Sequence, residues 1–165
     1  MSVLLDGLHP GPWYGRPWSW SLIAPMFASA QEAEFAYYEA LARGDVGQLM
    51  QVWADDEEIV CVHPGGLRLI GHLAVRESWE QILRHGALHI QISKGIELQT
   101  MVGATHTLVE QISAQGPKGD EYAYCYATNV FHKGPNGWKM VLHHASAAPQ
   151  QASAIDLHDT PGTLH

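Results

Sequence analysis

Apolar residues recur at helical spacing in three stretches of the first half of the chain. The first stretch begins at Ser29 and Glu32, which match a capping box, and its pattern ends at Gly44. Asp45 is placed to cap a second, short helix. Because only Gly44 and Asp45 separate these two helices, we expect them to fold back on each other. A third helix is predicted after Gly71, where apolar residues cover one face.

The other elements are predicted to be strands, because they are rich in β-branched and aromatic residues and end at glycine-containing turns. Two short strands flank the turn at residues 63–66. Four long strands follow the third helix, at residues 88–101, 104–114, 121–132 and 138–146. Three helices followed by this meander predict an α+β fold, in which the helices pack on the concave face of a curved antiparallel sheet.

The pattern divides the chain into a domain at residues 29–147 and two flanking segments. Residues 1–28 hold four prolines and three of the six tryptophans, so we expect an irregular arm whose aromatics pack on the body or on a second subunit. Residues 148–165 are predicted to form a tail. The alternative for the arm is a secretory signal cleaved at residues 28–30, but the acidic Asp6 and the prolines of the preceding stretch argue against it. We therefore expect a cytoplasmic protein.

Composition excludes several classes of partner. The 165 residues suit one domain, and 9 basic against 17 acidic residues give a net charge of −8. The basic residues are scattered, so we expect no nucleic acid and no anionic membrane as partner. No apolar run approaches the roughly 18 residues of a membrane span. Cys61 and Cys125 are expected to be buried thiols, with one disulfide as the alternative, and the cysteine spacing of a structural zinc site is absent from the sequence. We expect no metal and no cofactor.

The unusual feature of the composition is its eleven histidines. Most lie in the arm, in the tail or at element ends, where they titrate at the surface near pH 6–7. On the last strand the charge of Lys139 should point outward. Alternation then places His144 on the inner face with Trp138, and His143 on the outer face. His63, His89 and His144 therefore remain as candidates for the interior.

Three segments carry a resemblance to a known family. They are residues 40–56 with a Gly-Asp corner, the strand that ends in His63-Pro64-Gly65-Gly66 with Trp79 later in the sequence, and residues 128–146. In these segments the chain resembles the nuclear transport factor 2-like superfamily, the cystatin-like cone shared by ketosteroid isomerase and SnoaL-like cyclases. The resemblance implies an apolar interior that takes a small apolar or carbonyl-containing molecule. It also implies a homodimer formed through the convex face of the sheet.

The resemblance further implies two catalytic residues. Ketosteroid isomerases place their base before a Pro-x-Gly turn, which corresponds to His63, and their oxyanion-binding tyrosine corresponds to Tyr37. Their second oxyanion donor would fall at Thr128 or Asn129. Proton abstraction beside a carbonyl needs such a base and donor. The alternatives are that His63 only holds its turn and that Tyr37 belongs to the core.

Other residues are candidates for the wall of the cone or for ligand contact: Trp53, Trp79, His89, Asn129 and His144. The tryptophans are equally well explained as core. Either face of the strand at 121–132 could line the interior. Glu110 shares a strand face with His106, and we expect it to point outward as a surface charge rather than inward as a second base.

Function is expected to follow from this pocket. The leading hypothesis is an isomerase, cyclase or hydratase that works without a cofactor through His63 and Tyr37. The alternative is a non-catalytic ligand-binding or dimerisation module on the same fold.

Overall fold

The computed structural model describes residues 25–117 and 119–154. The predictions for residues 1–24 of the arm and 155–165 of the tail lie outside the described residues. The elements in chain order are α1 (Ala30–Arg43), α2 (Val46–Val52), β1 (Val60–Val62), β2 (Arg68–Ile70), α3 (His72–Leu83), β3 (Ile90–Gln99), β4 (Gly103–Gly116), β5 (Gly119–Gly134) and β6 (Gly137–Ala148). Three helices and a six-stranded sheet, whose four long strands all follow the last helix, confirm the predicted α+β class.

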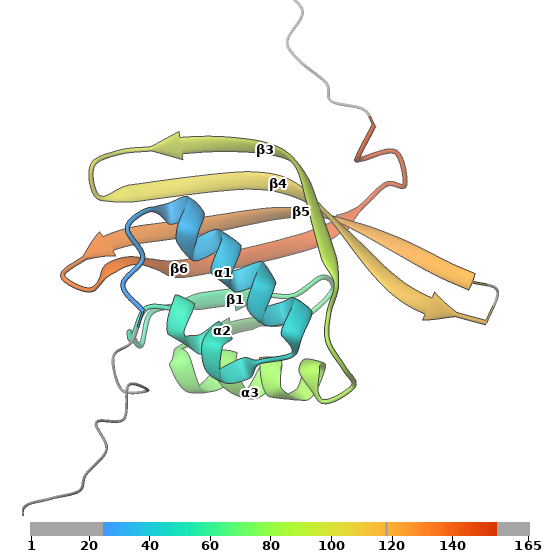
Figure 1. The fold of residues 1–165 in the computed structure, drawn as a ribbon, viewed down its shortest axis with the longest axis horizontal. Helices are drawn as coiled ribbons and strands as arrows, with labels where there is room; N and C mark the ends of the chain where they lie inside the picture. Colours follow the sequence, from blue (N-terminus) through green and yellow to red (C-terminus); the bar gives the residue numbers. More distant parts are fainter. Residues whose placement is uncertain (1–24, 118, 155–165) are drawn as a thin grey trace, which may run out of the picture.

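The predicted caps define the first two helices. The Ser29 hydroxyl accepts a hydrogen bond from the Glu32 N–H (3.0 Å), and the Asp45 carboxylate accepts one from the Gln48 N–H (2.9 Å). Between the helices, Gly44 adopts a left-handed conformation with φ of 66°, which glycine reaches without steric cost. The chain therefore turns sharply, and α2 packs back against α1 (Figure 1).

The strands form one sheet in the order β2-β1-β6-β5-β4-β3. The four long strands pair antiparallel as predicted, whereas β1 joins the sheet parallel to β6. The helices lie on one side of the strongly curved sheet, and the ends of β4 and β5 project beyond it (Figure 1). Residues 25–28 run beside the β5–β6 turn, where the Phe27 carbonyl accepts a hydrogen bond from the Trp138 N–H (3.0 Å). None of the helices in the described residues is long and apolar enough to cross a membrane.

A β-bulge in β6 corrects the prediction for His143 and His144. Val130 pairs with Leu142 while the next residue of β5, Phe131, pairs with Met140, so Val141 is an extra residue in β6. The extra residue reverses the alternation beyond it. His143 therefore points inward and is 3% exposed, whereas His144 is exposed on the outer face. The predicted inner position of His144 and outer position of His143 were wrong.

Glu110 lies on the inner face of the sheet, so its expected outward position was wrong. Its side chain is 2% exposed and faces α1, as does that of His106. The two share a face as predicted, but that face is the inner one. The sequence left open which face of β5 lines the interior. The structure shows that it is the face with buried Cys125, Ala127, Asn129 and Phe131, since Tyr122 and Tyr126 on the other face are exposed. Cys61 and Cys125 are buried free thiols, as expected.

Candidate functional site

A chain of polar side chains is buried between α1 and the inner face of the sheet. Helix α1 contributes Glu34 and Tyr38, which lie four residues apart and so share one helix face. The sheet contributes side chains from three adjacent strands. We call the six residues the buried polar network: Glu34, Tyr38, His106, Glu110, Asn129 and His143.

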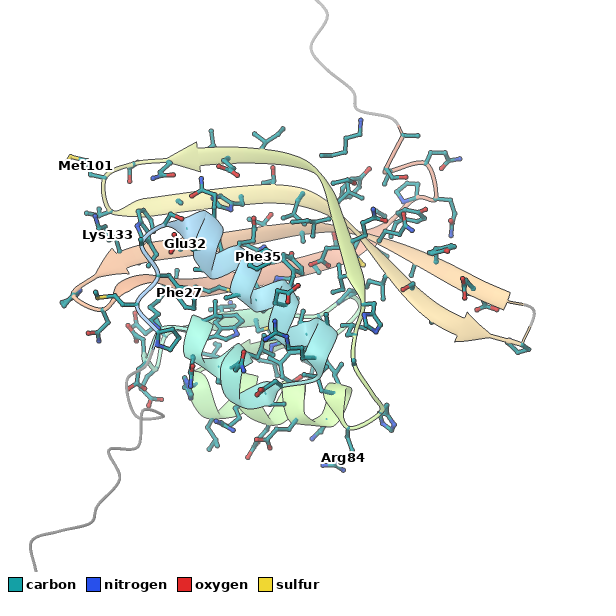
Figure 2. All side chains as sticks on the ribbon, viewed as in Figure 1. Phe27, Glu32, Phe35, Arg84, Met101 and Lys133 are labelled. Carbon is teal, nitrogen blue, oxygen red and sulfur yellow. The ribbon has the colours of Figure 1, made fainter. Side chains whose placement is uncertain are left out.

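Helix periodicity explains how a carboxylate comes to lie inside. Phe35, the residue after Glu34, lies on the side of α1 away from the sheet (Figure 2) and is 69% exposed. Glu34 itself faces the sheet and is 8% exposed. The polar residue thus occupies the core side and the aromatic one the solvent side. Such an inversion costs stability unless the buried group finds partners.

Hydrogen bonds join the network from end to end. His106 Nδ1 lies 3.0 Å from Glu34 Oε2, and Asn129 Nδ2 donates to Glu34 Oε1 at 2.8 Å. The same amide nitrogen donates to the Tyr38 hydroxyl at 3.1 Å, and that hydroxyl donates to Glu110 Oε1 at 2.8 Å. His143 Nδ1 lies 2.7 Å from Asn129 Oδ1. Asn129, which is 0% exposed, is therefore the centre of the network.

Burial changes the proton affinity of three members, and it raises the pKa of Tyr38 well above its ordinary value. Burial raises the pKa of Glu110 to about 7, and the negative charge of Glu34 adds to this, although the hydrogen bond from Tyr38 opposes it. Burial lowers the pKa of His143 to about 3, with smaller contributions from His63 and His144. At neutral pH the Glu110 carboxyl can therefore both take up and release a proton, while His143 is neutral.

Aromatic rings enclose the network on the side of α2 and α3. The Tyr37 ring lies 5.3 Å from the His143 ring, 5.9 Å from Trp79 and 6.4 Å from Trp53, measured between centroids. In the described part of the chain four buried polar atoms lack a hydrogen-bond partner: Tyr37 Oη, Trp53 Nε1, Trp79 Nε1 and His106 Nε2. Most buried polar atoms are paired, so these four are exceptions, each of which could still take a hydrogen bond.

Comparison with known proteins assigns the family. The family model described as a SnoaL-like domain matches residues 30–150. The chain belongs to the SnoaL-like family. A comparison with curated proteins finds no match.

Solved structures of similar proteins agree with this assignment. A proposed calcium/calmodulin-dependent protein kinase type II association domain from Thiobacillus denitrificans is 30% identical, with a TM-score of 0.69, and the match covers 76% of this chain and 99% of that one. A proposed dehydratase of the NTF2-like family from Streptomyces avermitilis is 31% identical, with a TM-score of 0.64, covering 70% and 91%. An NTF2-like superfamily protein from Salmonella enterica shares the fold at 15% identity, with a TM-score of 0.64, covering 76% and 93%.

In the SnoaL-like domain, the two residues expected to be catalytic both lie against the ring of Trp79. His63 is half-buried, and its ring meets Trp79 edge-on at 4.6 Å. His63 Nε2 lies 2.9 Å from Ser78 Oγ and 3.8 Å from Cys61 Sγ. Burial lowers the pKa of His63. Tyr37 is fully buried, and its pKa is raised by burial first and by the nearby Cys61 second.

The remaining candidates separate into interior and surface residues. Trp53, Trp79 and Asn129 are buried in the interior of the SnoaL-like domain. His89 is exposed at the start of β3, where it lines an open surface pocket of about 450 Å³. His144 is exposed on the outer face. No three His, Cys, Asp or Glu side chains in residues 25–117 and 119–154 are placed to share a metal ion.

Sequence reasoning did not select four members of the network, Glu34, Tyr38, His106 and His143, and it expected a fifth, Glu110, at the surface. For the two helical residues a signal exists, because their spacing of four residues places two polar side chains on the face of α1 that carries buried Ala30, Ala33 and Leu41. For His143 no such signal exists, because the bulge at Val141 breaks the alternation from which its inward position could have been predicted.

Proposed function

We propose that this SnoaL-like protein is an acid–base enzyme that eliminates water from a small hydroxylated carbonyl compound, or adds water in the reverse direction. The observation that carries the proposal is Glu110, a buried carboxyl with a pKa of about 7 that is held by the Tyr38 hydroxyl. A proton carrier works best when its pKa lies near the working pH. Carboxyl groups in such surroundings are more common at functional sites than elsewhere.

The interior offers a complementary group for each step. The Glu110 carboxylate removes a proton from the carbon beside the carbonyl, and the electron pair left behind forms the new C=C bond. The C–O bond to the hydroxyl breaks, and the leaving oxygen takes the proton from Glu110 to become water. Tyr37, whose buried hydroxyl is unpartnered, donates to the carbonyl oxygen as negative charge develops there.

The comparisons favour elimination among the possible proton transfers. The Streptomyces avermitilis protein named as a proposed dehydratase is 31% identical over 70% of this chain. The aromatic rings around Tyr37 favour a small substrate with an apolar body. Water addition, which the leading hypothesis from the sequence included, is the same reaction reversed.

The resemblance to ketosteroid isomerase supports a different base, His63. Its Nε2 atom is already within hydrogen-bond distance of Ser78 Oγ, and Trp79 lies against its ring. Two variants separate the alternatives. If Glu110 is the base, the Glu110→Gln variant loses activity and the His63→Ala variant keeps most of it; if His63 is the base, the His63→Ala variant loses it.

The experiment measures hydrogen exchange and elimination on a panel of β-hydroxy ketones with and without an aryl group. Exchange of the proton beside the carbonyl is followed by NMR in D₂O, and formation of the enone is followed by ultraviolet absorbance. We expect Glu110→Gln to slow both by about 10²-fold or more, the usual contribution of a general base. The matched control is Glu58→Gln, which makes the same change at an exposed position. Equal rates for wild type and Glu110→Gln on a turned-over substrate would overturn the proposal.

A second proposal concerns self-association, and we propose a homodimer formed through the outer face of the sheet. One row of paired residues crosses that face without a formal charge: Ile70, Val60, Leu142, Val130, Thr105 and Leu98. Its end residue Leu98 is 67% exposed. Support also comes from the Thiobacillus denitrificans protein, which is named as an association domain. An uncharged apolar patch of this kind suits a protein interface.

A further inference from the structure

The amide of Asn129 fixes the direction of every hydrogen bond around it. Its Nδ2 group has two hydrogens and donates to both Glu34 Oε1 and the Tyr38 hydroxyl. Its Oδ1 atom can only accept, so the bond to His143 Nδ1 requires the hydrogen on the histidine. The Tyr38 oxygen accepts from Asn129, so its own hydrogen goes to Glu110.

Glu34 holds the amide in this orientation. A carboxylate only accepts hydrogen bonds, so rotating the amide by half a turn would bring Asn129 Oδ1 to about the 2.8 Å position now held by Nδ2. Two acceptors would then face each other in a buried site, which is costly because neither is solvated. His106 Nδ1 binds the other oxygen of Glu34 at 3.0 Å, which keeps the carboxylate from turning away.

The consequence falls on His143. With the hydrogen on Nδ1, its Nε2 atom carries a lone pair and can only accept a hydrogen bond. The His143 ring lies 5.3 Å from Tyr37 and 6.3 Å from Trp79, which places it in the aromatic enclosure. A ligand group that contacts Nε2 there binds most favourably if it donates a hydrogen bond to that atom.

We propose that Glu34 is a positioning residue that sets the hydrogen-bond direction of the network, makes His143 Nε2 an acceptor, and so selects ligands that present a hydroxyl or N–H group at that point. Glu34 acts through Asn129 and touches no ligand. The ligand part rests on the proposed function, since the hydroxyl that a dehydratase removes is such a group. The positioning part depends only on the hydrogen bonds within the protein and not on the proposed function.

The test of the positioning part is ¹⁵N NMR of the histidine side chains. The His143 signal is identified as the one missing in a His143→Asn variant. In wild type we expect a protonated Nδ1 and an unprotonated Nε2. In Glu34→Gln the new amide N–H can donate to a rotated Asn129, whose Nδ2 then donates to His143 Nδ1, so we expect the hydrogen to move to Nε2. The matched control is Glu39→Gln on the same helix, whose exposed carboxylate pairs with Arg43 and which should leave the signal unchanged.

Two results would overturn the positioning part. One is a wild-type spectrum with the hydrogen on Nε2, a measurement that does not depend on the folding of Glu34→Gln. The other is a folded Glu34→Gln protein in which His143 keeps its hydrogen on Nδ1, because Tyr38 and Glu110 would then set the direction instead.

The ligand part is tested with phenol and anisole, which differ in that only phenol carries an O–H. We expect phenol to shift the His143 Nε2 signal of wild type and anisole to leave it unchanged, with this preference lost in Glu34→Gln, where Nε2 donates and the oxygen of either probe can accept. Equal responses of wild type to both probes, including no response to either, would overturn the ligand part. Neither probe is turned over, so these outcomes are independent of whether the protein proves to be a dehydratase.

Discussion

The stability of the protein should depend on the protonation of Glu110. The pKa of this carboxyl rises from its ordinary value of 4.5 to about 7 in the folded state, so the folded protein binds the proton more tightly than the unfolded chain does. The stabilisation by the protonated group is therefore complete below about pH 4.5 and is lost as the pH rises through 7. Because each tenfold change in proton affinity is worth about 1.4 kcal/mol, the loss amounts to about 3 kcal/mol.

The perturbation that isolates this effect is Glu110→Gln. Glutamine has the same shape, stays neutral at every pH, and its carbonyl oxygen can accept the hydrogen bond that Tyr38 now donates to Glu110. We expect the variant to match wild type near pH 4.5 and to exceed it by about 3 kcal/mol near pH 8.

Urea unfolding followed by tryptophan fluorescence measures the free energy of unfolding at each pH, with Trp53 and Trp79 as buried reporters. Glu58→Gln is the control, because an exposed carboxylate should give a difference from wild type that does not change with pH. If the difference between wild type and Glu110→Gln is also the same at pH 5 and pH 8, the reasoning from burial is refuted.

Three further predictions concern stability and assembly. Asn129→Ala should lower the free energy of unfolding by about 4 kcal/mol, because it leaves buried groups of Glu34, Tyr38 and His143 unpaired; a loss below about 1 kcal/mol in urea unfolding would contradict the network. Gly137→Ala should cost at least about 2 kcal/mol, because its φ is 80° and a Cβ would lie 2.5 Å from the Phe27 carbonyl oxygen, while Gly134→Ala, with open space, should cost little; equal losses would contradict this. Leu98→Glu should halve the mass seen by light scattering and Phe35→Glu should not, whereas an unchanged mass for Leu98→Glu would exclude the outer face as the interface.

The fold could be predicted because its signals are local. The Ser29 and Asp45 caps and the left-handed Gly44 each act within one turn of the chain, and glycine turns separate the long strands. The parallel pairing of β1 with β6 was not predicted, because it joins segments about 80 residues apart in the sequence and no local pattern encodes it.

The site was predictable only in part, because its members depend on contacts between distant elements. Tyr37, Trp53, Trp79 and Asn129 are interior residues that the resemblance or the strand pattern selected. Glu110 was assigned to the surface because a charged residue in a strand usually lies there. Its burial is stabilised by the hydrogen bond from the Tyr38 hydroxyl on α1, which the sequence pattern of the strand does not reveal.

His143 illustrates a different limit. Strict alternation from Lys139 gives the wrong face, since one inserted residue, Val141, exchanges inner and outer positions for the rest of β6.

The measurement that tests the account most directly is the titration of Glu110 itself. The ¹³C signal of its side-chain carboxyl, identified by its absence in Glu110→Gln, is followed by NMR from pH 4 to pH 9. The account predicts a midpoint near pH 7, at which this carboxyl carries protons for the reaction. A midpoint near its ordinary value of 4.5 would contradict the central claim.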